Sequence, residues 1–392
     1  MSSVVGVNLL WLVPGVVGGS EEYTVRLLRA FDRLDPEDLE LKLYAQPSLT
    51  EAYPDLTNRF ETVLAPRALS NKVARIGADA TWLVRAARHD DLLHHAGSVA
   101  PATSPRPYVF TVHDLQPLDL PENFSLIKRN WMKRMMPTSI RNATMVLCPS
   151  RFAADSVVRH VDWSVDRIRV VPHGHEPVEA GVAHADVAAD LARRFGRYLL
   201  LPAIAYPHKR HVDLIDALAR LADEMPDLSV VFTGGPGPET EALDEHAASL
   251  GLARRVHRLG RVSEAELDDL YRSAAALVFP STYEGFGNPA LEAMARGCPV
   301  IASDAASIPE VVGDAGLLVP PRSPNELASA VRRLLTDPDL EAELRSAGPV
   351  RAEAFGWKAA GQALIDAYRD ALRIEAQGAA GEGGVSDHRE SS

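Results

Sequence analysis

Residues 281–300 read STYEGFGNPALEAMARGCPV and place two glutamates, Glu284 and Glu292, around a Gly-Phe-Gly-Asn-Pro turn. The apolar runs ALVFPS and PVIAS lie on either side of this turn. Both runs are short, partly β-branched and bounded by helix breakers, which predicts two buried strands. The stretch therefore predicts a strand, a glycine turn, a short helix and a second strand.

The predicted helix has recognisable ends. Asn288 is a favourable N-cap, Pro289 suits the first helical position, and Gly297 suits the helix end. Glu284 then lies beyond the carboxyl end of the first strand, where open α/β sheets bind ligands. Glu292 is expected in the first turn of the helix. An acid at that position can be there only because it interacts favourably with the helix dipole, without any role in ligand binding. Without further evidence, Glu284 could equally be a solvated loop acid.

Composition narrows the class of protein. The chain has 392 residues, 46% of them hydrophobic and 24% charged, which suits two globular domains. A formal charge of −12 argues against a nucleic-acid-binding protein. The apolar opening has no basic residue before Arg26, so it is expected to be a buried strand and not a signal peptide. Cys148 and Cys298 are expected to be structural thiols of a cytoplasmic protein.

Strand and helix patterns alternate along the chain, which predicts α/β units around parallel sheets. Strands are expected in both halves of the sequence, at 4–12, 40–44, 91–95, 108–112, 144–148, 168–171, 198–202, 229–233, 256–259, 276–280, 299–302 and 317–319. An aperiodic segment in between marks a domain boundary. The predicted parts are an N-terminal domain, a linker, a C-terminal domain, a final helix and a disordered tail, at 1–178, 179–195, 196–354, 355–376 and 377–392.

The second half resembles the donor domain of retaining GT-B glycosyltransferases of family 4, the "glycosyl transferases group 1" family. The resemblance rests on five motifs that arrive in the order of the family: PHKRH (207–211), VVFTGGPGPE (230–239), LGRVSEAELDDLYRSAAALVFPS (259–281), EGFGNPALE (284–292) and GCPVIASDAASIPEVVGDAGLLVPP (297–321). Two glutamates separated by seven residues are typical of that family. The resemblance implies two Rossmann-like domains with parallel sheets that face each other across a cleft, and a C-terminal helix that packs back on the N-terminal domain.

The resemblance also implies residue roles. Glu284 would hold hydroxyls of the donor sugar near the reacting carbon, and Glu292 would accept hydrogen bonds from the ribose. A helix N-terminus at a glycine turn would stabilise the diphosphate. The donor-binding residues implied in the second domain are Lys209, Gly234, Gly235, Gly285, Phe286, Gly287, Asn288 and Glu292.

Lys209 follows a predicted strand, where its ammonium could reach the donor diphosphate as a point charge, although it could also be an ordinary surface lysine. Many relatives carry an arginine six residues earlier. Here that position is Ala203, so either a neighbour such as Arg210 substitutes or the site depends more on Lys209 and backbone amides. His208 lies beside Lys209, but a metal-binding role for a turn histidine has weak support.

In the first domain, the Gly18-Gly19 loop precedes a helix expected to be capped by Ser20, and it resembles the family's glycine loop facing the donor phosphates. His113 lies beyond a strand end and matches the family's histidine near the transferred sugar, although such a histidine is often structural. His173 is expected to be a turn residue.

Asp337 and Asp339 formally match a metal-binding D-x-D motif, but they lie between two helical patterns and are predicted to cap a helix. We therefore expect no cofactor and no metal requirement.

The segment 123–154 contains six basic residues and no acid. Lys128, Arg129, Lys133 and Arg134 are spaced to share one helical surface. Such a surface could be a solvated helix face, or it could contact an anionic membrane or a lipid-diphosphate acceptor.

These observations predict a retaining, metal-independent hexosyltransferase. It would move a sugar from a nucleotide-sugar donor, first of all GDP-mannose by the resemblance, to a hydroxyl of a glycan or glycolipid acceptor. It would be cytoplasmic, with a possible peripheral contact at the inner face of the membrane. Two alternatives stay open: a nucleotide-sugar epimerase on the same scaffold, and a catalytically silent sugar-nucleotide-binding subunit.

Overall fold

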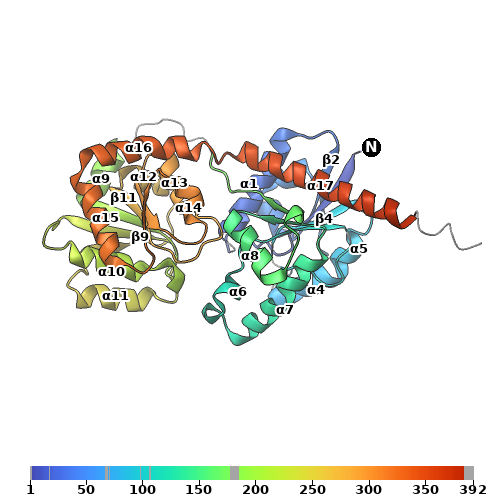
Figure 1. The fold of residues 1–392 in the computed structure, drawn as a ribbon, viewed down its shortest axis with the longest axis horizontal. Coiled ribbons are helices and arrows are strands. Elements are labelled where there is room, and N and C mark those ends of the chain that lie inside the picture. Colours follow the sequence, from blue (N-terminus) through green and yellow to red (C-terminus); the bar gives the residue numbers. More distant parts are fainter. Residues whose placement is uncertain are drawn as a thin grey trace, which may run out of the picture. The chain divides into compact units, whose positions relative to one another are not determined.

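A computed structural model describes residues 2–16, 18–66, 69, 71–97, 99–105, 107–176 and 185–383. The chain divides into two compact units, Met1–Gly174 with Trp357–Ser392, and His175–Gly356. Each unit has a parallel sheet covered by helices, and each is described by itself below (Figure 1).

The first unit is built on a parallel sheet with strand order β3-β2-β1-β4-β5-β6-β7. Its strands are β1 (Ser3–Asn8), β2 (Leu39–Ala45), β3 (Glu61–Leu64), β4 (Leu92–His95), β5 (Tyr108–Thr111), β6 (Met145–Cys148) and β7 (Ile168–Val170). Its longer helices are α1 (Gly19–Leu34), α4 (Lys72–Ala78), α7 (Leu126–Asn142), α8 (Arg151–Val161) and α17 (Trp357–Gly383). Shorter helices are α2 (Ser48–Ala52), α3 (Pro54–Arg59), α5 (Val84–Ala86) and α6 (Gln116–Asp119).

Helix α17 is last in the sequence but belongs to the first unit, as the resemblance implied. It packs along α1 (Figure 1). Leu364, Ile365 and Tyr368 of α17 are buried in the same core cluster as the apolar side chains of α1. Burying large apolar side chains of this kind contributes about 1.5–3 kcal/mol each, so packing fixes the helix here.

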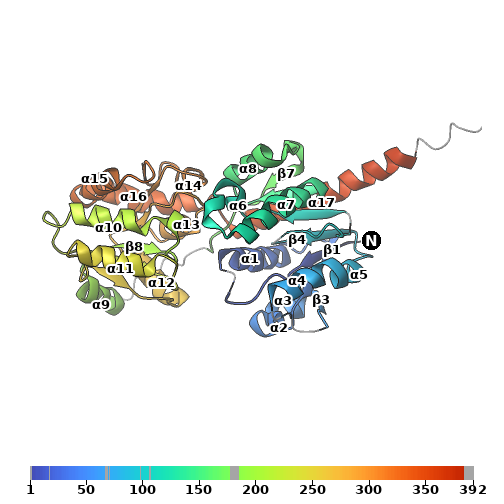
Figure 2. The ribbon, with the colours of Figure 1, turned by 90° about the horizontal axis from the view of Figure 1, so that it is seen from below.

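The second unit has the strand order β10-β9-β8-β11-β12-β13, with neighbouring strands parallel. The strands are β8 (Arg197–Pro202), β9 (Leu228–Thr233), β10 (Val256–Arg258), β11 (Ala276–Phe279), β12 (Val300–Ser303) and β13 (Leu317–Val319). The helices are α9 (Ala185–Phe195), α10 (His211–Arg220), α11 (Thr240–Ser249), α12 (Glu264–Ser273), α13 (Asn288–Ala295), α14 (Ile308–Val312), α15 (Pro324–Thr336) and α16 (Pro338–Ala352). Helices α10 and α15 lie side by side (Figure 2).

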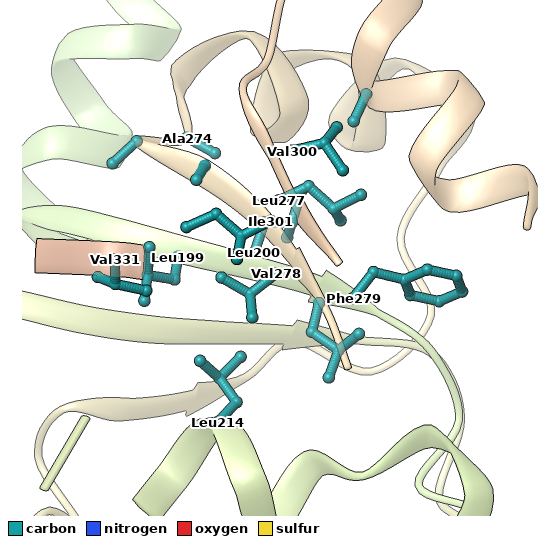
Figure 3. Packing of buried hydrophobic residues seen from close by; sticks show 14 of the residues in the cluster. Leu199, Leu200, Leu214, Ala274, Leu277, Val278, Phe279, Val300, Ile301 and Val331 are labelled. Atoms are coloured by element: carbon teal, nitrogen blue, oxygen red, sulfur yellow. The ribbon is translucent and has the colours of Figure 1, made fainter. Parts of the chain in front are cut away.

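Helices on both faces explain why the central strands are apolar throughout. Figure 3 shows Leu199 and Leu200 of β8, Val278 and Phe279 of β11 and Ile301 of β12 together in the core of the second unit. All five side chains are fully buried. The two free cysteines are buried too, as predicted for structural thiols.

Several boundaries differ from the sequence predictions. The first strand ends at Asn8, before the predicted 12, and β3 was not predicted. The segment predicted as a linker, 179–195, contains α9 from Ala185, whose Leu191 and Phe195 pack into the second core; residues 179–184 lie outside the described residues. The tail predicted to begin at 377 continues α17 to Gly383, and 384–392 lie outside the described residues.

Candidate active site

The strongest candidate site lies where the chain order of the second sheet reverses. The chain runs from β8 outward to β9 and β10, and then returns to the other side of β8 as β11. Loops after β8 and β11 therefore leave adjacent strands at a topological switch point, which is where open α/β sheets bind ligands. Lys209 follows β8 in a 3₁₀ turn, and Glu284 follows β11.

The structure brings Lys209 and Glu284 together. Lys209 Nζ donates to Glu284 Oε1 at 2.7 Å and to Oε2 at 2.9 Å. The side chains are 19% and 13% exposed, so the pair is mostly shielded but open to solvent on one side. The two loops are also joined through the backbone, because the Thr282 amide donates to the His208 carbonyl at 2.8 Å. Two residues 75 apart in the sequence thus form one charged pair.

The backbone around Glu284 is held by a serine that sequence analysis missed. Ser307 Oγ lies 2.9 Å from the Glu284 carbonyl and 2.7 Å from the Phe286 carbonyl. Ser307 is fully buried, so these contacts fix the turn from within the protein. Its signal in the sequence is weak, since a serine before an Ile-Pro-Glu run looks like a simple helix cap.

The predicted helix start needs correction. Gly287, with φ of 120°, is the N-cap of α13, and Asn288 is the first helical residue, because only glycine readily adopts that φ. Glu292 consequently lies beyond the first turn, where the dipole effect on an acid is weak. The Phe286 side chain is buried against Phe355 at 5.7 Å between ring centroids, so only its backbone faces the turn.

Glu292 is oriented by a tyrosine. The hydroxyl of Tyr271, from α12, donates to Glu292 Oε2 at 2.9 Å. Burial and then the negative charge of Glu292 raise the pKa of Tyr271 well above its usual value, so the hydroxyl remains a donor. Arg296 also donates to the Glu292 carbonyl at 3.0 Å, which fixes the helix at this residue.

Two histidines flank the Lys209 turn. Burial, and then the nearby Lys209 charge, lower the pKa of His208 to about 4. Burial likewise lowers the pKa of His211 to about 4, and its Nε2 donates to the Ala203 carbonyl at 3.1 Å. Both rings are neutral at pH 7. Within the described part of the chain, no three His, Cys, Asp or Glu side chains form a group that could hold a metal ion.

Gly234 and Gly235 directly follow β9, on the same edge of the sheet as Lys209. Gly234 has φ of 111°, and a Cβ there would lie 3.1 Å from the Ala203 carbonyl carbon. The turn after β9 therefore packs against the loop after β8, and glycine is required for it.

Three predicted site residues, Gly18, Gly19 and His113, belong to the first unit. Gly18 is the N-cap of α1, which begins at Gly19, so the predicted Ser20 cap is wrong. Glu21, which sequence analysis overlooked, accepts a hydrogen bond from the Gly15 amide at 2.9 Å and another from the Tyr53 hydroxyl at 2.7 Å. This buried carboxylate holds the backbone at Gly15 against α1.

His113 follows β5, and its Nε2 lies 2.9 Å from the Ala96 carbonyl in the loop after β4. Burial lowers its pKa to about 4, so the ring is neutral at pH 7. A carbonyl can only accept, so Nε2 carries the proton and Nδ1 is an acceptor. Its ring packs edge-on against Tyr23 at 5.4 Å. His173, predicted to be a turn residue, is buried and lies 4.3 Å from the Tyr23 ring.

Comparisons with known proteins place the chain in a family. The family model described as "Glycosyltransferase Family 4" matches residues 17–178, and the one described as "Glycosyl transferases group 1" matches residues 196–351. A D-inositol 3-phosphate glycosyltransferase of Streptomyces bingchenggensis is 29% identical over 92% of this chain and 86% of its own length. An MMP alpha-(1->4)-mannosyltransferase of Mycolicibacterium hassiacum is 30% identical over 72% of this chain and 70% of its own.

Solved structures agree on the fold. Anabaena Alr3699/HepE in complex with UDP and glucose superimposes with a TM-score of 0.73 at 20% identity, over 94% of this chain and 100% of its own. WaaG, a glycosyltransferase involved in lipopolysaccharide biosynthesis, superimposes with a TM-score of 0.71 at 16% identity, over 92% of this chain and 98% of its own. The chain belongs to the glycosyltransferases of family 4, group 1, and has their GT-B fold of two Rossmann-like domains.

Proposed function

We propose that this glycosyltransferase moves a hexose from a nucleotide-sugar donor to a hydroxyl of a glycan or glycolipid, with retention at the anomeric carbon and without a metal ion. The Lys209–Glu284 pair at the switch point of the second sheet is the observation that carries the proposal. GDP-mannose is the first donor to test. The names of two relatives support mannose, the MMP alpha-(1->4)-mannosyltransferase and the Escherichia coli O-antigen chain mannosyltransferase B, which is 28% identical over 67% of this chain.

The proposed reaction requires positive charge near the leaving diphosphate. When the bond between sugar and diphosphate breaks, negative charge grows on the phosphate oxygens. Lys209 Nζ can offer hydrogens to the β-phosphate while its carboxylate partner, Glu284, turns to the sugar hydroxyls. The N-terminus of α13 at Gly287 adds backbone amides with a partial positive charge. These groups would stabilise the transition state electrostatically, which is the larger part of most enzymatic rate enhancements.

Retention follows from front-face attack in this proposal. Glu284 is already paired with Lys209 and is assigned to hold the donor sugar, so it is not assigned as a covalent nucleophile. The acceptor hydroxyl would attack from the side that the diphosphate leaves, and a departing phosphate oxygen would take the acceptor proton. In the first unit, Nδ1 of His113 would accept a hydrogen bond from the transferred sugar. Glu292, held by Tyr271, would accept from the ribose hydroxyls.

A metal ion is not needed in this scheme, because Lys209 and α13 supply the positive charge. The D-x-D motif is otherwise engaged: Asp337 caps α16, and its side chain accepts from the Leu340 amide at 3.1 Å.

A ligand screen with product analysis tests the function. Thermal unfolding is followed with UDP, GDP, ADP and their hexose conjugates, and a binding ligand should raise the midpoint. The conjugate of the best diphosphate is then supplied with candidate acceptors, and the anomeric configuration of the product is read by NMR. A product with inverted configuration rules out the retaining mechanism. Conversion of the donor sugar without an acceptor would favour the epimerase, and binding without any turnover would favour the silent subunit.

We further propose that α7 contacts an anionic membrane that carries the acceptor. The structure has no helix in its described part that is long and apolar enough to cross a membrane. Lys128, Arg129, Lys133 and Arg134 are all exposed on α7. Four other side chains of α7 pack inward against the core of the first unit: Trp131, Met132, Met135 and Met136.

Exposed apolar side chains next to these cations favour a membrane over a plain solvated face. Leu126 is 73% exposed and Ile127 is 86% exposed, at the start of α7. Val73, at the start of α4, is 80% exposed. The start of α4 lies beside α7, because the adjacent Lys72 places its ammonium 5.2 Å from the Trp131 ring centroid. Apolar tips surrounded by cations are suited to the interface of an acidic bilayer.

Sedimentation with vesicles tests the membrane contact. The protein should sediment with vesicles of phosphatidylcholine and phosphatidylglycerol at low salt, and less at high salt. Reversing the four α7 cations to glutamate should abolish sedimentation, and Leu126→Ser with Ile127→Ser should weaken it without a change in charge. Val350→Ser, which alters a 68% exposed residue of the second unit, is the matched control. If the unmodified protein ignores acidic vesicles at low salt, α7 is an ordinary solvated face.

A further inference from the structure

We infer that Arg261 supplies the second cation for the donor diphosphate, in place of the arginine that many relatives carry at the position of Ala203. The inference rests on the proposed function, because it assumes that a nucleoside diphosphate binds at the switch point of the second sheet. The inferred binding residue lies in the loop after β10, whereas the arginine that it replaces would lie in the loop after β8.

Arg210 is the obvious replacement by sequence position, but its side chain is engaged elsewhere. Its Nη2 and Nε donate to the two carboxylate oxygens of Asp213 at 2.6 and 3.0 Å. Asp213 is 2% exposed, so the carboxylate that pairs with Arg210 is buried in the first turn of α10. Moving Arg210 to a phosphate would leave a buried carboxylate without its cation, which is costly. Arg210 is therefore a structural residue of the turn.

Three loops meet beside Ala203. They follow β8, β9 and β10, which are adjacent strands of the sheet. A Cβ on Gly234 would lie 3.1 Å from the Ala203 carbonyl carbon and from the Ile204 amide nitrogen. The Gly234 amide donates to the Gly260 carbonyl at 2.7 Å, which joins the loop after β9 to the loop after β10. The residue next to Gly260 is Arg261.

The Arg261 side chain extends over this junction. A Cβ on Gly235 would lie 3.6 Å from Arg261 Nε, so the guanidinium group lies against the glycine turn. Arg261 is an exposed residue at the carboxyl edge of the sheet. Neighbouring strands are separated by about 4.8 Å, so an extended arginine from the loop after β10 can reach the region in front of β9 and β8. Lys209 approaches the same region from the loop after β8.

Arginine is suited to this task. Its planar fork can donate two parallel hydrogen bonds to phosphate oxygens, whereas Lys209 acts as a point charge. The glycines at 234 and 235 would leave room for the diphosphate to approach the guanidinium, since neither has a side chain. A chain that lacks the usual arginine after β8 would thus hold the diphosphate between Lys209 on one side and Arg261 on the other.

Calorimetry separates a phosphate contact from a base contact. Dissociation constants are measured for UDP, GDP and ADP and for uridine, guanosine and adenosine, with the unmodified protein and with Arg261→Ala. We expect the best diphosphate to bind at least about 10-fold more weakly to the variant, because a charge-assisted hydrogen bond is lost. The matching nucleoside should bind equally well to both. Arg261→Lys should recover part of the lost affinity, since it restores the charge but not the fork.

Two further variants sharpen the test. Arg254→Ala removes an exposed arginine at the other end of β10 and should leave the affinity for the diphosphate unchanged. Ala203→Arg, added to Arg261→Ala, should restore diphosphate affinity by returning the cation to the loop after β8. The inference is overturned if Arg261→Ala binds the diphosphate as the unmodified protein does, or loses nucleoside and diphosphate affinity equally. If the unmodified protein binds none of the six probes, the proposed function fails and this inference fails with it.

Discussion

At the scale of single residues, the Lys209–Glu284 pair allows a sharp test of the proposed roles. Glu284→Gln keeps the size of the side chain but removes the charge opposite Lys209. We expect turnover to fall about 100-fold or more, since a group acting at the reacting centre is lost. Affinity for the nucleoside diphosphate should be kept or increased, because Lys209 no longer shares its charge with a carboxylate. Initial rates and calorimetry measure the two quantities.

Glu343→Gln is the matched control for this prediction, because Glu343 is an exposed acid of the same unit, on α16. It should change neither quantity. A Glu284→Gln enzyme that transfers sugar at the unmodified rate would remove Glu284 from the site.

Glu292 and Tyr271 should act on donor binding as one unit. Glu292→Ala removes a contact made equally in the ground and transition states, so the donor KM should rise while kcat changes little. Tyr271→Phe should raise the same KM by a smaller factor, because the carboxylate loses its 2.9 Å hydrogen bond and its fixed orientation. The double variant should have the same donor KM as Glu292→Ala alone, since the tyrosine acts through the glutamate. Additive effects would show that the two residues act independently.

At the scale of elements, most strands and the glycine turn at 285–287 could be predicted, whereas the exact helix start at that turn could not. The strands of the second unit are short runs of buried apolar residues, a pattern that periodicity detects directly. The start of α13 depends on the φ of 120° at Gly287, a backbone feature that residue preferences for caps do not reveal. Strand β3 was missed because its residues are only partly buried or exposed, so the apolar pattern is weak.

The same reasoning applies to the candidate site. Lys209 and Glu284 could be named from motifs, but their contact depends on β8 and β11 being neighbours, which is a property of the sheet order. Ser307 and Tyr271 contact the site residues from a loop and from α12, so no local pattern marks them. Sequence analysis thus identifies the charged residues that belong to a motif, and it misses the residues that hold these charged side chains in place.

The cap of α16 provides a prediction at this scale. Asp337→Ala should lower the free energy of unfolding by about 0.5–2 kcal/mol, because the Leu340 amide loses its acceptor. Asp337→Asn should cost little, since asparagine also caps well. Neither variant should alter the rate of transfer or its response to EDTA. A metal requirement that disappears in Asp337→Asn would overturn the assignment of this residue to capping.

At the scale of the whole molecule, each unit has its own core, and the first unit is completed by the last helix of the chain. Polar contacts add to the packing of α17: Arg169 Nη2 lies 2.9 Å from Asp370, and Arg369 Nη2 lies 2.6 Å from Asp38. Exposed ion pairs of this kind contribute little to stability, because water screens them. Apolar burial of α17 therefore dominates, and the first unit depends on the C-terminal helix for its stability.

The first unit also contains buried histidines that should make it sensitive to acid. Burial lowers the pKa of His94 and of His95 to about 3, and that of His113 to about 4. An unfolded histidine titrates near pH 6.5. Between these values the unfolded chain binds protons that the folded chain does not, so stability falls as the pH falls from about 6.5 toward 4. Burial also lowers the pKa of His173 well below its usual value. Asp79, whose pKa burial raises to about 6, acts in the opposite direction and offsets one of these four histidines.

Urea unfolding measures this balance. We expect the free energy of unfolding to be clearly lower at about pH 5 than at about pH 7.5. On unfolding, these four histidines and also His208 and His211 of the second unit take up protons, whereas Asp79 releases one. His94→Gln should reduce the pH dependence by about one proton, because the buried ring that donates and accepts between Tyr368 and Thr111 no longer titrates on unfolding. His89→Gln is the matched control, since this exposed histidine lies in the same unit and its loss should leave the pH dependence unchanged. Equal stability at the two pH values would mean that these histidines are protonated in the folded protein, and that the buried network around them admits charge.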